Sequence, residues 1–343
     1  MNDGGQQLDG EPVARVLVAG ASGFTGALAA QIVWAHPRLE LARVTARSDV
    51  GTPLNELYSR YRVPLLLEEL DPDAVRDCDV AIVAYPHGAS APAVAALRER
   101  GLKVVDLSAD FRLRDPDTYR RWYGDPPDPR LAAEAVYGLT ELYRWGIADA
   151  DLVANPGCYP TAAVLALAPL AEAGVVEDVV IDAKSGVSGA GRGGGERHHF
   201  VSVDENFTPY GTEGHRHEPE IAQELSALGS DPPLTFVPHL LPLDQGELVS
   251  CYVRLSRALG AAELERMYWE RYGGEPFVEL TDAPPGVRDV RDTNSCRIHV
   301  TLDEDAGRAV VFAAIDNLWK GGAGQAVQNL NLMLGLPETE GLT

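Results

Sequence analysis

Gly20-Ala21-Ser22-Gly23-Phe24-Thr25-Gly26 joins an apolar, strand-like run at residues 13–19 to a helix-like run at residues 27–36. A strand, a glycine-rich turn and a helix in this order are typical of dinucleotide-binding domains. The glycines let the backbone approach a pyrophosphate, which rests on the helix N-terminus. The segment therefore predicts an α/β, Rossmann-type first domain. The residues expected to bind its cofactor are Gly20, Ser22, Gly23, Phe24, Thr25 and Gly26.

The next strand-like run, residues 39–45, indicates which dinucleotide is bound. Enzymes selective for NAD usually place an acidic residue at the end of this strand, where it binds the ribose 2′-hydroxyl. Here the strand ends in Thr45-Ala46-Arg47-Ser48. A cation and a hydroxyl suit a 2′-phosphate better, so we expect NADP, held by Arg47 and Ser48. The alternative for Arg47 is an ordinary solvated surface charge.

Two more strand ends are expected near the cofactor. The strand at residues 79–84 ends in Tyr85-Pro86-His87, and the strand at residues 102–107 leads to Arg112. Loops at the carboxyl ends of parallel strands line the cofactor crevice, which places Pro86 there. His87 either contributes to the site or only packs the loop. Arg112 can bind a phosphate or carboxylate through two N–H groups.

Asn155-Pro156-Gly157-Cys158-Tyr159-Pro160-Thr161 is a turn that opens into a helix, because proline is tolerated in a helix's first turn. Cys158 would then lie at the helix N-terminus, where free N–H groups and the helix dipole favour a thiolate. The pKa of such a thiol falls from its usual value of about 8.5. Cys158 is therefore a candidate nucleophile, and the alternative is a buried structural cysteine.

From about residue 175 the sequence becomes rich in strand patterns, which predicts an α+β second domain with a mostly antiparallel sheet. The expected strands are 179–183, 234–237, 247–255, 296–302 and 309–315, and the expected helices are 218–227 and 262–271. A terminal helix at 325–334 would return to the first domain. We expect a disordered tail at 1–12, a cofactor domain at 13–157 plus 320–343, and a catalytic and dimerisation domain at 158–319. Residues 114–144 look irregular.

Two segments of the second domain are dense in functional residue types. The run from Lys184 to Arg192 contains Ser188 and Gly189, and its small residues suit close approach to a nicotinamide. A flexible surface loop is the alternative.

The second segment is His215-Arg216-His217-Glu218-Pro219. Pro219 indicates a helix start, so His217 would lie at a helix N-terminus and is a candidate general acid–base. His215 and Arg216 could bind substrate anions. A metal site is a competing interpretation of the two histidines, but no further ligand at suitable spacing completes one.

Composition excludes several classes of partner. The chain has 343 residues, 45% of them hydrophobic, and a formal net charge of −22, which argues against nucleic acid or anionic membranes as partners. The start of the sequence shows no export signal. Cys78, Cys158, Cys251 and Cys296 lack the spacing of a disulfide framework or a zinc site, which suggests reduced thiols in the cytoplasm.

A nicotinamide domain, an activated cysteine and a histidine together define a reaction class. The cysteine attacks an acyl carbon, a thioester forms, and hydride reduces it to an aldehyde. An acyl phosphate is a suitable electrophile, and Arg112 is a candidate to hold its phosphate.

The chain resembles the N-acetyl-γ-glutamyl-phosphate reductase family over nearly its whole length. The matching motifs are G-A-S-G-F-T-G at Gly20, P-H-G at Pro86, D-L-S-A-D-F-R-L at Asp106, Y-G-L-T-E-L at Tyr137, N-P-G-C-Y-P-T at Asn155, K-S-G-V-S-G-A-G-R at Lys184, H-R-H-E-P-E-I at His215 and A-I-D-N-L-W-K-G at Ala314.

This resemblance implies NADPH-dependent reduction of N-acetyl-γ-glutamyl phosphate in arginine biosynthesis. It implies a thioester on Cys158, acid–base catalysis by His217, and a homodimer or homotetramer. By the same resemblance Asn155 contacts the substrate and Asn317 the cofactor.

One position departs from the family. Gln245 stands where the family usually has an arginine before the glycine at 246, and a neutral amide cannot replace a guanidinium on an anion without loss. A sister reductase acting on a carrier-protein-linked aminoadipyl or glutamyl phosphate is therefore the nearest alternative. A non-catalytic NADP-binding regulator is an alternative from a different class.

Overall fold

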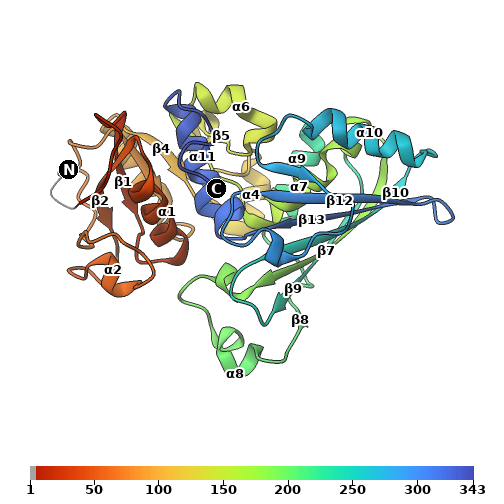
Figure 1. Ribbon diagram of the computed structural model, residues 1–343, viewed down its shortest axis with the longest axis horizontal. Coiled ribbons are helices and arrows are strands. Elements are labelled where there is room, and N and C mark those ends of the chain that lie inside the picture. The colour runs from red at the N-terminus through yellow and green to blue at the C-terminus, as the bar shows by residue number, and fades with distance from the viewer. Residues whose placement is uncertain (1–4) are drawn as a thin grey trace. The chain divides into compact units, whose positions relative to one another are not determined.

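The computed structural model describes residues 5–343, so residues 1–4 of the expected tail lie outside the described part. The chain forms two compact units (Figure 1). The first unit runs to Pro156 and resumes at Gly322–Thr343, and the second is Gly157–Gly321.

The first unit is built on a parallel sheet with the strand order β2-β1-β3-β4-β6-β5. Its strands are β1 (Ala14–Ala19), β2 (Leu39–Thr45), β3 (Val80–Val83), β4 (Lys103–Asp106), β5 (Val136–Tyr137) and β6 (Leu152–Ala154). The chain moves from β1 to one side for β2 and to the other side for β3. The ends of β1 and β3 therefore form the switch point at which such sheets bind ligands. The predicted Rossmann-type fold is confirmed.

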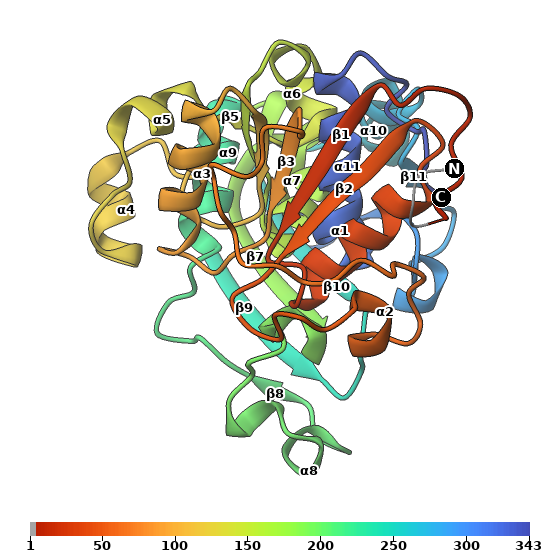
Figure 2. The same ribbon diagram turned by 90° about the vertical axis from the view of Figure 1, so that its left-hand side faces the viewer.

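Helices cover both faces of this sheet (Figure 2). α3 (Ser90–Glu99) and α5 (Pro129–Glu134) share a core with one set of alternating strand residues, among them Leu17, Ala81 and Val83. α1 (Phe24–Ala35) lies beside α11 (Gly324–Met333), and α6 (Thr140–Ala148) packs on α11. The expected terminal helix is therefore α11. A short helix, α2 (Leu54–Leu57), follows β2.

The stretch from 114 to 144 is more regular than expected, since it contains α4 (Pro116–Tyr123), α5, β5 and the start of α6. Asp115 caps α4 by accepting the N–H groups of Asp117 and Thr118, and Asp128 caps α5 by accepting that of Arg130. In both helices a proline follows the cap. An aspartate N-cap before a proline is a strong helix start, and the sequence interpretation overlooked it twice.

The described part of the tail, residues 5–12, is irregular but attached. Gln6 is buried, and its side chain donates to the carbonyls of Val33 and Leu39 and accepts the N–H of Leu41. These bonds join it to both α1 and β2. The tail therefore differs from the disordered segment that its composition predicted.

The second unit has a mixed sheet with the order β11-β12-β13-β10-β7-β9-β8. Its strands are β7 (Val176–Gly186), β8 (Thr208–Pro209), β9 (Leu234–Leu241), β10 (Glu247–Leu255), β11 (Val278–Leu280), β12 (Cys296–Asp303) and β13 (Arg308–Ile315). The pairs β7–β9 and β11–β12 are parallel, and the remaining neighbours are antiparallel.

α7 (Cys158–Glu172), α9 (Glu218–Ala227) and α10 (Ala261–Tyr272) lie on one face of this sheet (Figure 1). α7 is buried along almost its whole length, because Ala and Leu line it on every side. The unit also contains a short helix, α8 (Phe200–Val203), and it ends within a π-helical turn, Trp319–Ala323.

Candidate active site

The glycine turn after β1 has a backbone that accepts no side chain at two positions. Gly20 has φ +88°, and a Cβ there would lie 2.5 Å from the carbonyl oxygen of Ala84. A Cβ on Gly26 would meet the carbonyl of Gly20. Gly23 is the N-cap of α1 and supplies no side-chain cap, and the first turn of α1 contains no acidic residue. Such a helix start is suited to a pyrophosphate.

The polar residues expected around the ribose phosphate lie beside this turn. The hydroxyls of Ser22 and Ser48 are 3.2 Å apart, which joins the glycine turn to the end of β2. Arg47 is exposed, and its charge opposes the rise that burial causes in the pKa of Tyr85. Two hydroxyls and a guanidinium at this strand end fit a 2′-phosphate. Phe24 packs edge-on against Tyr58, whose hydroxyl donates to the Ser22 carbonyl, and Thr25 lies half-buried in the first turn of α1.

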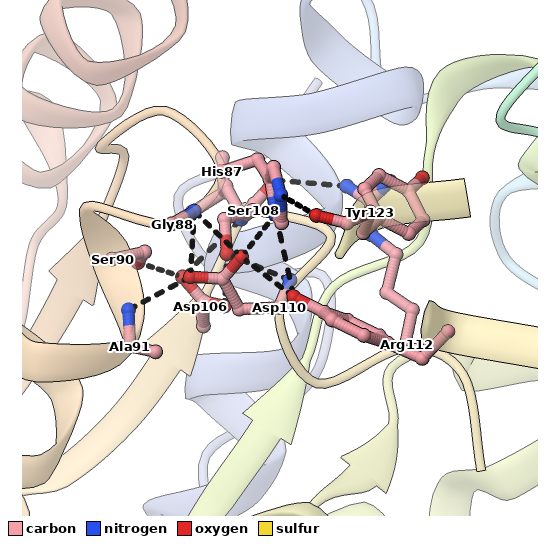
Figure 3. Close-up of polar contacts among 11 residues, drawn as sticks. His87, Gly88, Ser90, Ala91, Asp106, Ser108, Asp110, Arg112 and Tyr123 are labelled. Carbon is pink, nitrogen blue, oxygen red and sulfur yellow. Dashed lines mark hydrogen bonds and ion pairs between the residues drawn. The ribbon is translucent and has the colours of Figure 1, made fainter. Parts of the chain in front are cut away.

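The loop after β3 is held by two buried carboxylates (Figure 3). Asp110 accepts the backbone N–H groups of Gly88 and Ala91, and its Oδ1 lies 2.6 Å from Nδ1 of His87. His87 Nε2 in turn lies 3.2 Å from the carbonyl oxygen of Tyr123. Both ring nitrogens are thus used to fix the loop, with Pro86 exposed at its start.

Asp106, at the end of β4, is the second of these carboxylates. It accepts the hydroxyls of Ser90 and Ser108. Burial raises its pKa to about 6, against the opposing effect of these two hydrogen bonds.

Arg112 and Asn155 lie at the neighbouring strand ends but are largely engaged with the protein itself. Arg112 donates from Nε to the carbonyl of Asn155 and from Nη2 to that of Leu107, both at 2.8 Å. The Asn155 amide donates to the Gly322 carbonyl and accepts from Asn329. Both residues are buried, Arg112 at 8% and Asn155 at 1% exposure.

Cys158 is the first residue of α7, and Gly157 is the N-cap, as the sequence predicted. The helix is 15 residues long, and Gly157 offers no side chain to its N–H groups. Pro160 occupies the first turn, where its missing N–H costs no hydrogen bond. Cys158 is half-buried, whereas Cys78, Cys251 and Cys296 are buried. It is therefore the cysteine placed for chemistry.

Glu220 ties a second helix to this turn. Its carboxylate, 1% exposed, accepts the N–H of Gly157 at 2.9 Å. Glu220 belongs to the first turn of α9, whose N-cap is His217. The predicted helix start at His217 is confirmed, and the Glu220 bond holds it beside the start of α7.

His215 and His217 surround Tyr159, the residue after Cys158. The Tyr159 ring meets His215 at 5.8 Å and His217 at 5.7 Å between centroids, both edge-on. His215 Nδ1 accepts the N–H of His217 at 3.1 Å. Burial lowers the pKa of His215 to about 4, with Arg216 adding to the effect, so His215 is neutral near pH 7. A neutral imidazole can position its neighbour but carries no charge to attract an anion. The neighbouring cation, Arg216, is exposed.

Ser188, Gly189 and Asn317 lie together in the second unit. Asn317 donates to the Ser188 hydroxyl at 3.0 Å and accepts the N–H of Gly246 at 2.8 Å. A Cβ on Gly189 would lie 3.3 Å from the hydroxyl of Ser185. The segment after β7 is therefore packed against the loop before β10 rather than loose at this point.

The Gln245 side chain points at two acidic residues. Its side-chain amide donates to Asp316 at 2.8 Å and to Asp292 at 3.3 Å, and Arg291 donates to the backbone carbonyl of Gln245. Gln245 is 4% exposed. The residue at this position thus joins segments of the second unit, and this explains how the chain tolerates an amide here.

The sequence interpretation missed two acids, Glu220 and Glu247. Glu247 begins β10, is fully buried, and interacts with the Cys158 thiol. The sequence does contain a pattern that points to Glu247. Side chains alternate between the two faces of a strand, and this alternation places Glu247 on the same face of β10 as the apolar Val249 and Cys251.

Comparison with known proteins identifies the class. Residues 15–150 match the family model described as "Semialdehyde dehydrogenase, NAD binding domain", and residues 158–317 match "Semialdehyde dehydrogenase, dimerisation domain". The chain belongs to the semialdehyde dehydrogenase family.

Individual relatives indicate which enzyme of this family the chain resembles. N-acetyl-gamma-glutamyl-phosphate reductase of Moorella thermoacetica is 48% identical over 95% of this chain and 96% of that protein. The enzyme of the same name from Rubrobacter xylanophilus is 48% identical over 95% of this chain and 97% of its own. The resemblance inferred from the motifs is confirmed.

Solved structures show the same fold at lower identity. Aspartate semialdehyde dehydrogenase II from Vibrio cholerae aligns with a TM-score of 0.73 and 18% identity, covering 94% of this chain and 98% of that one. Aspartate semialdehyde dehydrogenase with NADP from Candida albicans aligns with a TM-score of 0.71 and 15% identity, covering 93% and 98%. Across residues 5–343, every helix is too short or too polar to cross a membrane.

Proposed function

We propose that this chain catalyses the NADPH-dependent reduction of N-acetyl-γ-glutamyl phosphate to N-acetylglutamate 5-semialdehyde and phosphate, a step of arginine biosynthesis. The observation that carries the proposal is the pairing of two helix starts in the second unit. Cys158 begins α7, His217 caps α9, and Tyr159 contacts His217 beside the thiol.

Each of these residues has a distinct part in the reaction. The Cys158 sulfur attacks the acyl carbon, and the C–O bond to phosphate breaks to leave a thioester on the sulfur. Backbone N–H groups at the start of α7 are placed to stabilise the oxyanion that forms there. His217 moves the proton at the carbonyl oxygen or the departing phosphate. NADPH supplies the hydride that turns the thioester into the aldehyde.

The first unit supplies the residues that would hold this cofactor. The turn from Gly20 to Gly26 offers the start of α1 to the pyrophosphate, and Arg47, Ser48 and Ser22 offer a cation and two hydroxyls to the 2′-phosphate. In the second unit, Ser188, Gly189 and Asn317 are proposed to border the nicotinamide.

The reverse reaction tests the proposal directly. N-acetylglutamate semialdehyde, NADP and phosphate should yield NADPH, whereas aspartate semialdehyde should yield little. Cys158→Ser should abolish turnover and still bind NADPH in a fluorescence titration. Turnover that does not require phosphate would contradict the proposal. Inactivity with both aldehydes would favour a carrier-linked substrate.

We also infer that two copies of the chain associate through the sheet face opposite α7, α9 and α10. On that face Tyr252 is 36% exposed and pairs with Val180 on one side and Val310 on the other, which makes an apolar row. The matched dimerisation domain supports association. Tyr252→Glu should convert a dimer, or a tetramer, to smaller species in sedimentation velocity. An unchanged sedimentation coefficient would place the interface elsewhere.

All four cysteines are present as thiols, which supports a reducing, cytoplasmic compartment.

A further inference from the structure

β10 carries an acid in the stripe of residues that faces the helices. Its buried positions alternate from Glu247 through Val249, Cys251 and Val253 to Leu255, and Glu247 has no exposed surface. A carboxyl group in such a stripe loses its hydration, which is costly unless another group compensates. A purely structural strand would place an apolar residue at this position.

The neighbours of Glu247 show what it faces. In the sheet it lies between Ile315 of β13 and Ser185 of β7. Across residues 5–343, neither carboxyl oxygen has a hydrogen-bond partner. The Cys158 thiol lies near enough to lower the pKa of Glu247, and a Cβ at Gly321 would meet both Cys158 and Ile315, the residue paired with Glu247 in the sheet.

Three further titratable groups surround this pair. Asp316, just after β13, acts on Glu247 through its charge. The Tyr159 hydroxyl on α7 and the Tyr210 hydroxyl after β8, 3.2 Å from each other, both respond to the charges of Glu247 and Cys158. Burial raises the pKa of Glu247 to about 8, the Cys158 thiol opposes that rise, and Asp316 adds to it. Burial also raises the pKa of both tyrosines far above neutrality, so they do not exchange protons near pH 7.

We propose that Glu247 is a catalytic residue that takes the proton from the Cys158 thiol and later returns it, an assignment that rests on the proposed function. The S–H bond breaks and an O–H bond forms on the carboxylate, which leaves the thiolate to attack the acyl carbon. When the C–S bond breaks at the end of the cycle, its electron pair stays on sulfur and the Glu247 O–H returns its proton there. The exchange consumes no other reactant.

The proposal separates the tasks of two residues at the site. Glu247, on the sheet side of the site and inside the protein, exchanges a proton with the sulfur. His217, at the start of α9, then transfers protons only at the oxygen and phosphate of the substrate. A single negative charge shared between sulfur and carboxylate also requires that the two groups titrate as a coupled pair.

The pH profile of Cys158 alkylation tests this without substrate or cofactor. The rate of reaction with iodoacetamide, read by mass spectrometry of the Cys158 peptide, should rise in two steps between about pH 6 and pH 10 in the unmodified chain, because both members of the pair titrate. Glu247→Gln should leave a single step. Glu224→Gln, which alters another buried carboxyl of the second unit, should keep both steps. A single step in the unmodified chain would overturn the proposal even if the Glu247 variants failed to fold.

Turnover provides the second readout. Glu247→Gln should lower kcat by about a hundredfold or more, within the range of proton-transfer catalysis, with KM and NADPH affinity nearly unchanged. Glu247→Asp, which keeps a carboxyl group, should recover part of the loss. Equal loss in both variants, with the two alkylation steps unchanged, would reduce Glu247 to a structural role. Absence of reductase activity in the unmodified chain would instead refute the proposed function and leave the alkylation result standing.

Discussion

Gly321 packs directly against Cys158. A Cβ atom at position 321 would lie 2.7 Å from Cβ of Cys158 and 3.2 Å from its Cα. Gly321 belongs to the π-helical turn Trp319–Ala323, and its N–H donates to the carbonyl of Asp316 at 2.9 Å. The turn after β13 therefore fixes the position of the thiol from one side, and single-turn π-helices are frequent at functional sites.

Gly321→Ala should therefore displace Cys158. We expect kcat to fall by about a hundredfold, because a shift of about 1 Å in a reacting group can have that effect. Overpacking should also lower the free energy of unfolding by about 1–3 kcal/mol. Steady-state kinetics and urea unfolding measure the two effects. Gly274→Ala is the matched control, since a Cβ there meets nothing within 4 Å. Full activity in Gly321→Ala would show that the turn moves to accommodate the methyl group without displacing Cys158.

Gln245→Leu tests whether position 245 is a structural or a ligand position. The variant removes the donor to Asp316 and Asp292, and the loss of a partner to the buried Asp316 carboxyl should reduce the free energy of unfolding by about 1–3 kcal/mol. The KM of the acyl phosphate should stay within about threefold, a change worth less than about 1 kcal/mol. A tenfold rise in KM with unchanged stability would show instead that Gln245 contacts the substrate.

The features predicted from sequence are those with local signals. The helix start at Cys158 follows from Gly157 and Pro160, and the start at His217 follows from Pro219, all within a few residues. The strand, glycine turn and helix at Gly20 are likewise contiguous.

The features that escaped prediction depend on distant partners. Glu220 bonds a residue 63 positions away, and Glu247 faces Cys158 only after β10 has joined the sheet. Arg112 was expected to contact substrate because of its place after a strand, and Asn155 because of the family resemblance. Their engagement by carbonyls and by Asn329 depends on a packing that motif and spacing do not specify.

His215 should make stability depend on pH in a defined window. Its folded pKa of about 4 lies below its ordinary value of 6.5 because of burial. The folded state therefore prefers the neutral ring, and this contribution is fully present above about pH 6.5 and is lost as pH falls toward about 4. His215→Asn removes the titration.

From pH 7 to pH 5 the unmodified chain should lose about 2 kcal/mol of unfolding free energy relative to His215→Asn. Urea unfolding at the two pH values measures this difference. His199→Asn, which changes an exposed histidine, should follow the unmodified chain. Parallel behaviour of all three proteins would mean that His215 is accessible to protons in the folded state.

Arg47→Ala tests the choice of cofactor. Arg47 is exposed at the end of β2, beside the paired hydroxyls of Ser22 and Ser48, so its charge is available to a 2′-phosphate. Loss of one charge-assisted contact should weaken NADPH binding by about tenfold, which corresponds to about 1.4 kcal/mol. NADH lacks the 2′-phosphate, and its affinity should not change. The NADPH effect should also shrink at high salt, because an exposed charge is screened.

Fluorescence titration with both dinucleotides measures these affinities. Arg130→Ala removes another exposed cation of the first unit and controls for the general loss of positive charge on a chain whose net charge is −22. An equal loss of NADPH and NADH affinity in Arg47→Ala would mean that Arg47 acts on the whole nucleotide. Selectivity for NADP would then have to come from the hydroxyls of Ser22 and Ser48, which lack the charge to distinguish the two cofactors as strongly.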